Sequence, residues 1–475
     1  MSRNKRRVWA SVLFICLMVL SSVTACGKTA DAVQTEGMKK IGSYNVESEV
    51  NYTDESEKEE VLEQFASDDR LCIIDKYPTY YDVTLDYEKG TPSEVGQAYA
   101  ETIIKAVPEY EAAFEPYLYE NIRFAFDGRE INYETLEKRI RTLEAAIPDE
   151  YREEAESFAR TIAAGEEGYL ENGKLSYIEA ITMQLVPDAL RPTACSALSL
   201  TGSKTVTGER MTLRNLEWHI GSKGQITDIH AVTHMKKGER SLTSISVLGM
   251  LDMITAVNDD GVMIAILDVG SVEEEPFVYK GKKCYTFEIR KALEEFSTAK
   301  EAGDFMVGES GDYTWCHNLI ISDAKDAFCA EDVTSEVEAT GKGRSVLRDE
   351  NSELMEGLTW DSPDSLCIVN SYATKGNQDS FTGEASNINR FFKYNKWVKD
   401  KEKFSIADMK GIMAHEVVEQ YYIVNVHSEG TVHTVIVDYA TGKIHVSFTK
   451  GIAEDVPRYI EVARLQGYHD HCPVR

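Results

Sequence analysis

The sequence predicts an α+β fold, with two stacked and mainly antiparallel sheets covered by helices and a mainly helical segment before them. Apolar residues recur at helical spacing between Thr91 and Leu185, whereas short runs rich in β-branched residues follow Cys195. Two helical stretches, 287–296 and 405–418, interrupt these runs. Strands in groups with helical insertions are typical of layered sheets covered by helices.

The helices before Cys195 begin with a clear start signal at Thr91. Threonine can cap a helix, Pro92 suits the first helical position, and Glu94 completes a capping box. An apolar stripe follows, and Pro108 is expected to end or kink this helix. Further helices are expected over Tyr133–Ala146, Asp149–Ala164 and Tyr177–Leu185.

The strands predicted after Cys195 are short and largely aliphatic. They are Ser196–Thr201, Met211–Arg214, Thr243–Val247, Val262–Leu267, Leu319–Ser322, Leu366–Val369, Val432–Asp438 and Lys443–Phe448. The helix over 287–296 places Ile289, Ala292 and Leu293 on one face, and Ser405 with Asp408 forms the start signal of the second helix.

The first 26 residues have the features of an export signal. A basic start precedes the apolar run Val8–Leu20, which is too short to span a bilayer comfortably. Small residues then lead to Cys26, and this pattern resembles the bacterial lipoprotein signal. Lipidation of Cys26 would anchor the chain at the extracytoplasmic face of the bacterial cell membrane, whereas an ordinary secretory signal is the alternative.

Composition limits the classes of partner and cofactor. The 475 residues include 80 acidic and 51 basic side chains, a net charge of −29, which disfavours nucleic acid. Of nine cysteines, Cys16 and Cys26 lie in the signal, and the other seven form neither a disulfide framework nor a zinc pattern. His415 lacks a second histidine four residues later. His469, His471 and Cys472 could bind a metal, but a frayed tail is the preferred interpretation of these residues. No metal or cofactor is expected.

Cys195 stands where the helical region gives way to the β-rich region. A cut before it would give this residue a free α-amine, whose pKa of about 7.7–8.0 suits a general base. One residue would then hold both nucleophile and base. The alternative is a buried core cysteine, the commonest state of a free cysteine.

The stretch CSALSLTGSKTVTGERMTLRNLEWH, residues 195–219, resembles the start of the catalytic chain in the cysteine N-terminal-nucleophile amidases. This superfamily includes bile salt hydrolases, penicillin V acylases, acid ceramidase and the acyl-coenzyme A:aminopenicillanic acid acyltransferase group. Further segments that resemble the family follow in the same order, at 256–266, 289–302, 317–333, 368–372, 386–392 and 433–446. Two upstream segments resemble the helical pro-regions of the acyltransferase-like and ceramidase-like branches.

The resemblance implies an αββα sandwich and hydrolysis of non-peptide amide bonds in small N-acyl amines. The nucleophile would be Cys195, freed by self-cleavage after Ala194. Arg214 would favour its thiolate electrostatically. The family has an aspartate where this chain has Glu217. Glu217 would accept a hydrogen bond from the new α-amine, but its extra methylene would displace the acceptor oxygens.

Four more polar residues take roles from the same resemblance. Asn258 and Asn370 would help to form the oxyanion hole. Arg390 would hold the charge balance of the site or the substrate. Asn318 is a further polar candidate. For the asparagines a turn or strand-end role is the alternative, most of all for Asn258, because Asn-Asp-Asp-Gly is also a good turn.

These observations divide the chain into a signal (1–26), a flexible tether (27–60), a mainly helical pro-region (61–194) and a catalytic region (195–475). The membrane would be contacted through the lipid anchor only. Two rival functions stay open. One is an acyltransferase, in which an amine resolves the thioester. The other is a surface binding lipoprotein with the same fold and no catalysis, and Glu217 favours this rival.

Overall fold

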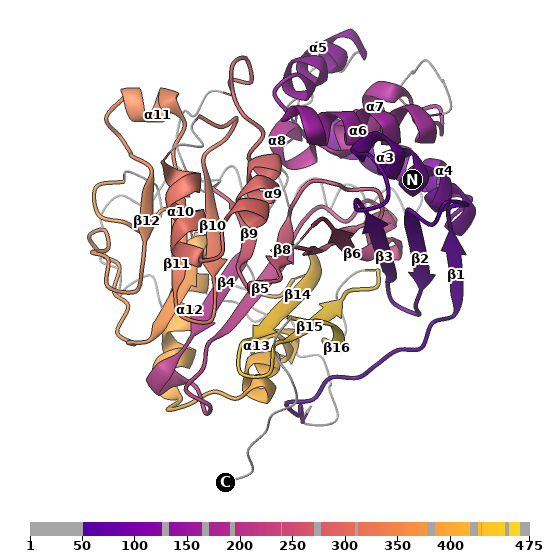
Figure 1. Ribbon diagram of the computed structural model, residues 1–475. Helices are drawn as coiled ribbons and strands as arrows, with labels where there is room; N and C mark the ends of the chain where they lie inside the picture. The colour runs from indigo at the N-terminus through magenta and orange to yellow at the C-terminus, as the bar shows by residue number, and fades with distance from the viewer. Residues whose placement is uncertain are drawn as a thin grey trace, which may run out of the picture.

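Figure 1 shows the computed structural model, which describes residues 51–125, 133–163, 171–190, 195–238, 240–269, 277–308, 312–377, 385–418, 426–428, 430–451 and 456–465. Its strands form a 10-stranded sheet and a 6-stranded sheet. Neighbouring strands are antiparallel in both sheets, with β3 and β6 as the parallel pair. The expectation of two mainly antiparallel sheets is confirmed.

The larger sheet has the order β1-β2-β3-β6-β7-β8-β9-β10-β11-β12. Its strands are β1 (Glu63–Ala66), β2 (Cys72–Lys76), β3 (Tyr81–Asp86), β6 (His230–Lys236), β7 (Leu242–Val247), β8 (Thr255–Asn258), β9 (Met263–Asp268), β10 (His317–Ser322), β11 (Ala327–Asp332) and β12 (Val346–Arg348). The smaller sheet has the order β13-β4-β5-β14-β15-β16. Its strands are β13 (Ser365–Ile368), β4 (Ser196–Leu200), β5 (Met211–Glu217), β14 (Thr431–Asp438), β15 (Lys443–Phe448) and β16 (Ile460–Arg464).

The helices fall into one group before Cys195 and a second group after it. The first group is α3 (Pro92–Ala106), α4 (Tyr110–Ala125), α5 (Tyr133–Glu144), α6 (Asp149–Ile162), α7 (Tyr177–Met183) and α8 (Val186–Leu190). The second is α9 (Tyr285–Glu295), α10 (Ala299–Val307), α11 (Ser335–Ala339), α12 (Ala385–Asp400) and α13 (Ile406–Val418). The reciprocal capping box of Thr91 and Glu94 starts α3 as predicted. None of the described helices has the length and apolar character needed to span a membrane.

The two sheets enclose one core, and helices cover their outer faces. Along β4, Ala197 belongs to the main core with Ile264 of β9, whereas Leu198 and Leu200 belong to a second cluster with residues of α12 and α13. This alternation follows from the two-residue period of a strand. In Figure 1, α9 and α10 lie over β9 to β11, while α12 and α13 lie by the smaller sheet.

Two features of the segment before Cys195 differ from the sequence expectation. Its first strands, β1 to β3, extend the larger sheet, because β3 pairs in parallel with β6. The end of the predicted tether is held in place, since Lys410 Nζ of α13 donates to the carbonyl oxygens of Thr53 and Glu55, each at 2.9 Å. Glu57 forms a parallel bridge with Ile460. The domain boundaries drawn from the sequence stay predictions.

Candidate active site

Cys195 lies directly before β4, which is hydrogen-bonded to β13 on one side and β5 on the other. The residue is 0% exposed and belongs to the core between the two sheets. The strand that it starts is therefore an interior strand, although it is second from the edge rather than central in the smaller sheet.

The backbone and side-chain polar atoms of Cys195 are contacted by residues far away in the sequence. Its backbone N donates to Asn370 Oδ1 at 2.6 Å, and its carbonyl oxygen accepts from Arg390 Nη1 at 2.7 Å. Its Sγ accepts from Arg214 Nη2 at 3.5 Å and lies 3.8 Å from the carbonyl oxygen of Glu217. The structure thus brings together five of the residues that the family resemblance singled out.

Arg214 is a buried cation without a carboxylate beside it among the residues that the structure describes. Its side chain projects from β5 into the core, where Nη2 also donates to the carbonyl of Ile266 at 2.9 Å, and Nη1 lies 3.3 Å from His433 Nε2. Burial lowers the pKa of Arg214, and Cys195 is the described group that acts to raise it. A thiolate on Cys195 would therefore be the counter-ion that this cation lacks.

The Cys195 thiol feels two opposing effects. Burial raises its pKa above the ordinary value, and the positive charge of Arg214 lowers it in part. Burial is the larger effect, so the expected thiolate is not the resting form in this closed, buried state. Arg214 therefore offsets the cost of forming a thiolate there, and a separate base is needed to remove the proton.

Asn370 and Arg390 form a network with Asn387, a residue that the sequence analysis missed. Arg390 Nη2 donates to Asn370 Oδ1 at 3.0 Å and to Asn387 Oδ1 at 2.6 Å. Asn387 Nδ2 in turn donates to Ser371 Oγ at 2.6 Å. The available signal was its position three residues before Arg390, which puts both side chains on one face of α12.

The contacts of Asn370 differ from the expected ones. Its Oδ1 accepts the backbone N–H of Cys195, and its Nδ2 donates to the carbonyl of Asp268 at 2.6 Å. It therefore holds the nitrogen that would become the α-amine. To stabilise an oxyanion, Asn370 would have to donate the second hydrogen of its Nδ2.

Glu217 does not hold the nitrogen of Cys195. Its carboxylate accepts hydrogen bonds from Thr431 Oγ1 at 2.5 Å, from Asn215 Nδ2 at 3.0 Å and from Ser428 Oγ. Burial raises the pKa of Glu217, and these donors oppose that effect. The expected role as acceptor of the α-amine is corrected, because Asn370 Oδ1 occupies that place and Glu217 contacts Cys195 through its carbonyl.

The other two asparagines lie outside this cluster. Both hydrogens of Asn258 Nδ2 are used, by the carbonyls of Leu293 at 2.9 Å and Phe296 at 3.0 Å, and its Oδ1 accepts from Val262 N. The oxyanion role expected for Asn258 is corrected to the turn role, since no amide hydrogen is left. Asn318 Nδ2 donates to the carbonyls of Val369 and Ser371, each at 3.0 Å, and so supports the backbone on either side of Asn370.

Some predicted features lie outside the described residues. These are Ala194 at the expected cut, Cys26 at the expected lipid anchor and Cys472 at the end of the chain. In the part of the chain that the structure describes, no group of three or more histidine, cysteine or acidic side chains is arranged to hold a metal ion.

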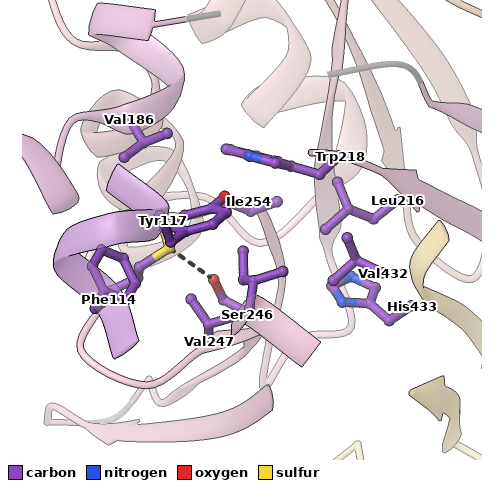
Figure 2. Close-up of a pocket in the computed structure, with 12 residues that line it drawn as sticks. Phe114, Tyr117, Val186, Leu216, Trp218, Ser246, Val247, Ile254, Val432 and His433 are labelled. Carbon is purple, nitrogen blue, oxygen red and sulfur yellow. Dashed lines mark hydrogen bonds between the residues drawn. The ribbon is translucent and has the colours of Figure 1, made fainter. Parts of the chain in front are cut away.

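A narrow apolar cavity adjoins the site on the side of α4 and α8. Figure 2 shows Phe114 and Tyr117 of α4 and Val186 of α8 facing Leu216 and Trp218 across it. Its volume is about 10 Å³, close to that of one water-sized sphere. His433 also lines this cavity and connects it to Arg214. Burial and the charge of Arg214 hold the pKa of His433 well below its usual value, so this imidazole is neutral.

Comparison with known proteins gives matches among solved structures. No family model matches the chain, and no curated protein sequence does. The chain is similar to a Caenorhabditis elegans ortholog of N-acylethanolamine-hydrolyzing acid amidase, with 12% identity over 51% of this chain and 92% of that chain and a TM-score of 0.35.

The chain is also similar to a mutant and a variant of conjugated bile acid hydrolase from Clostridium perfringens. Their identities are 13% and 14%, over 58% and 56% of this chain and 95% and 92% of those chains, with TM-scores of 0.32 and 0.30. An acid amidase and a bile acid hydrolase are the kinds of enzyme that the sequence motifs resemble. Similarity at this level assigns neither a substrate nor a residue role to this chain.

Proposed function

We propose that this chain is an amidase that cleaves N-acyl amines, with Cys195 as a nucleophile freed by self-cleavage. The observation that carries the proposal is the set of contacts on Cys195. Its nitrogen, carbonyl oxygen and sulfur are bound by Asn370, Arg390 and Arg214. A core cysteine that only fills space needs no such partners, and it needs no buried arginine against its sulfur.

The first step of the proposed reaction is self-cleavage. The Cys195 sulfur attacks the carbonyl carbon of Ala194, and the bond from that carbon to the Cys195 nitrogen breaks. The thiol proton passes to that nitrogen as the bond breaks, so the product is a thioester on Cys195 with a free α-amine. Water then hydrolyses the thioester, which leaves a carboxylate on Ala194 and restores the thiol. Arg214 stabilises negative charge on the sulfur during the attack.

Turnover would use the same atoms on the substrate amide. The α-amine of Cys195, held by Asn370 Oδ1, takes the thiol proton as sulfur attacks the acyl carbon. The second hydrogen of Asn370 Nδ2 faces the oxyanion, and the protonated α-amine gives its proton to the leaving amine. Water hydrolyses the resulting acyl-thioester. Arg390 fixes the positions of Cys195 and Asn370 relative to each other, because it donates a hydrogen bond to each of them.

The apolar cavity beside the site favours an apolar acyl group over a polar one. It begins at Leu216 and Trp218, which flank Glu217, the residue whose carbonyl lies by the Cys195 sulfur. The cavity is too small for a long chain as it stands, so an acyl group would have to separate its walls. We also propose, from the signal that ends at Cys26, that the enzyme acts while lipid-anchored outside the cytoplasmic membrane.

The test is an activity measurement on the chain purified from residue 27 onward. A panel of N-acyl amines, conjugated bile acids and penicillin V is incubated with wild-type protein, with Cys195→Ala and with Cys72→Ala. Cys72 is also 0% exposed but lies in β2, so it serves as the matched control. We expect release of the free amine by wild type and Cys72→Ala but not by Cys195→Ala. Equal activity of all three proteins, or none with any amide, would contradict the proposal.

A second amine added to the same reactions separates hydrolysis from acyl transfer. If the added amine acquires the acyl group in preference to water, the acyltransferase alternative replaces the hydrolase. The cluster around Cys195 serves both reactions, because they share the acyl-thioester.

A further inference from the structure

A second cavity, of about 310 Å³, lies where the edges of the two sheets meet. Its walls come from β12, from the loop that leads to β13, from β13 itself and from α12. It is separate from Cys195, because Cys195 faces the core between the sheets, whereas Phe391 and Leu358 of this cavity belong to the cluster on the helical side. Its volume is at the lower end of the range for small-molecule sites.

A buried arginine lines this cavity. Arg348 is 3% exposed, and its Nε donates to Glu331 Oε1 at 2.9 Å while Nη2 donates to the carbonyl of Cys367 at 3.1 Å. The structure records no hydrogen-bond partner for its Nη1 among the described residues. Glu331 has no acceptor capacity left for Nη1 of Arg348, because its two carboxylate oxygens also accept from Ala373, Thr374 and Asn377. Donor capacity on a buried cation is thus left for a ligand.

The remaining walls of the cavity are aromatic, aliphatic and acidic. The rings of Trp360 and Phe391 lie 5.2 Å apart, and Leu354 and Leu358 complete the apolar part. The acidic part includes Glu350, whose pKa is raised by burial and by the nearby Asp364. The cavity therefore presents one buried cation, carboxylates and an apolar surface within a small volume.

We propose that this cavity binds a free α-amino acid with an apolar side chain, with its carboxylate at Arg348 and its ammonium group at Glu350. A simple carboxylic acid would meet the carboxylates of the wall, and a simple amine would meet Arg348. A zwitterion matches both charges, and an apolar side chain matches Trp360 and the leucines. The proposal does not depend on Cys195 or on catalysis.

The test is calorimetric titration of the Cys195→Ala protein, which keeps the second cavity intact. The probes are L-phenylalanine and L-leucine, with N-acetyl-L-phenylalanine and 2-phenylethylamine as ligands that lack one of the two charges. We expect saturable binding of the two amino acids and at least about tenfold weaker binding of the other two, since each has lost one charged contact. Absence of saturable amino acid binding in the millimolar range, or equal binding of all four probes, would overturn the proposal.

A matched pair of variants locates the binding. Glu350→Gln removes the carboxylate in the cavity wall, whereas Glu353→Gln changes an exposed residue that pairs with Lys375 and does not line the cavity. We expect about tenfold weaker binding for Glu350→Gln and no change for Glu353→Gln. Arg348→Lys, which keeps a charge beside Glu331, should weaken the amino acids more than 2-phenylethylamine. Unchanged binding in both Glu350→Gln and Arg348→Lys would place the ligand elsewhere and overturn the assignment.

Discussion

Arg214 combines full burial with a lack of any described carboxylate partner, and its Nη2 lies 3.5 Å from Cys195 Sγ. A buried cation of this kind is costly unless an anion forms beside it. The cost is offset when the Cys195 sulfur becomes negative, during either attack that we propose. The same arginine would then serve self-cleavage and turnover.

The pH dependence of turnover tests this role of Arg214. In Arg214→Lys the cation is more mobile and its planar contact with sulfur is lost, so the pKa of the Cys195 thiol should rise. The limb of the kcat/KM profile that reports thiol ionisation should move to higher pH, and the maximal rate should fall about tenfold or more. The control is Arg210→Lys, because Arg210 donates to Ser199 and to the carbonyl of Lys325, away from Cys195. A profile that is unchanged in Arg214→Lys would argue against the role.

The grouping of Cys195, Arg214, Asn370 and Arg390 could be predicted from sequence motifs, because each is tied to a recognisable strand or helix segment. The exact partner of each atom could not. Asn258 belongs to a motif of the same kind, yet its Nδ2 donates to carbonyls at the end of α9 and its Oδ1 accepts from Val262 N within the turn. Asn387 carries no motif of its own. Nor could the sequence show that the Glu217 carboxylate accepts from three side chains, those of Asn215, Ser428 and Thr431.

At the scale of elements, helix starts were predictable because capping is local. The capping boxes of Thr91 with Glu94 and of Ser405 with Asp408 are present as expected. Helix α4 was not predicted, since Pro116 lies within it and proline usually interrupts a helix. Strand β6 was missed, because its histidines and lysine interrupt the pattern of residues that favours a strand. Pairing with β3 and β7 stabilises it as a strand.

The contact between α3 and α6 depends on a glycine. A Cβ at Gly96 would lie 2.3 Å from the carbonyl oxygen of Glu154, which is backbone and cannot turn aside. We expect Gly96→Ala to lower the free energy of unfolding by about 1–3 kcal/mol. Gly411→Ala in α13 is the control, because a Cβ there meets nothing within 4 Å, and alanine should be neutral or stabilising by up to about 1 kcal/mol. Thermal unfolding of both variants tests this difference in stability. Equal melting temperatures would be inconsistent with tight packing at Gly96.

Asp188 joins α8 to the start of α9, and a second buried aspartate, Asp252, lies close enough to feel its charge. Asp188 Oδ1 accepts from Tyr285 N at 2.7 Å, and Oδ2 accepts from Thr286 Oγ1 at 2.6 Å. Asp252 is 0% exposed, and neither of its carboxylate oxygens has a hydrogen-bond partner among the described residues. Burial raises the pKa of Asp188 to about 7, and burial together with the charge of Asp188 raises the pKa of Asp252 well above its usual value.

This pair predicts the sign of a pH effect on stability. Both carboxyl groups keep protons in the folded state at pH values where the unfolded chain has lost them. Unfolding therefore releases protons from about pH 4 to about pH 7 and above, and the free energy of unfolding falls as pH rises through this window. Asp252→Asn removes one of the titrating groups and leaves a neutral side chain of the same shape.

The melting temperature of wild type should therefore fall more between about pH 5 and about pH 8 than that of Asp252→Asn. Asp304→Asn is the control, since Asp304 is exposed and pairs with Lys300 on α10. Its melting curve should follow that of wild type. If wild type and Asp252→Asn have parallel pH dependences, the carboxyl pair is ionised in the folded state and this reading is wrong.

For the whole molecule, the structure predicts what happens to the two chains after a cut at Cys195. The segment before it contributes β3 to the ladder with β6, and a fully buried ion pair joins Glu154 of α6 to Arg290 of α9 at 2.8 Å. Both connections cross the proposed cut and neither is covalent. None of the six cysteines that the structure describes is joined to another of them by a disulfide.

The cleaved protein should therefore stay together until it is denatured. Size-exclusion chromatography in native buffer should give one species, and a denaturing gel of the same fraction should give two chains without any need for a reducing agent. Urea below the unfolding midpoint should not separate them, because the shared core of the sheets and helices must open first. Separation of the chains in native buffer would show that the segment before Cys195 is not an integral part of the fold.

The central claim is that Cys195 becomes an N-terminal nucleophile, and intact-mass measurement under denaturing conditions tests it most directly. Wild type purified from residue 27 should give two masses that match a break between Ala194 and Cys195, with residues 195–475 as the second chain. Cys195→Ala should give one unbroken mass, and Cys195→Ser should cleave slowly, because a hydroxyl can perform the same shift as a weaker nucleophile. A single unbroken mass for wild type that persists on prolonged incubation, together with inactivity toward every amide, would contradict the claim and favour a binding protein built on this fold.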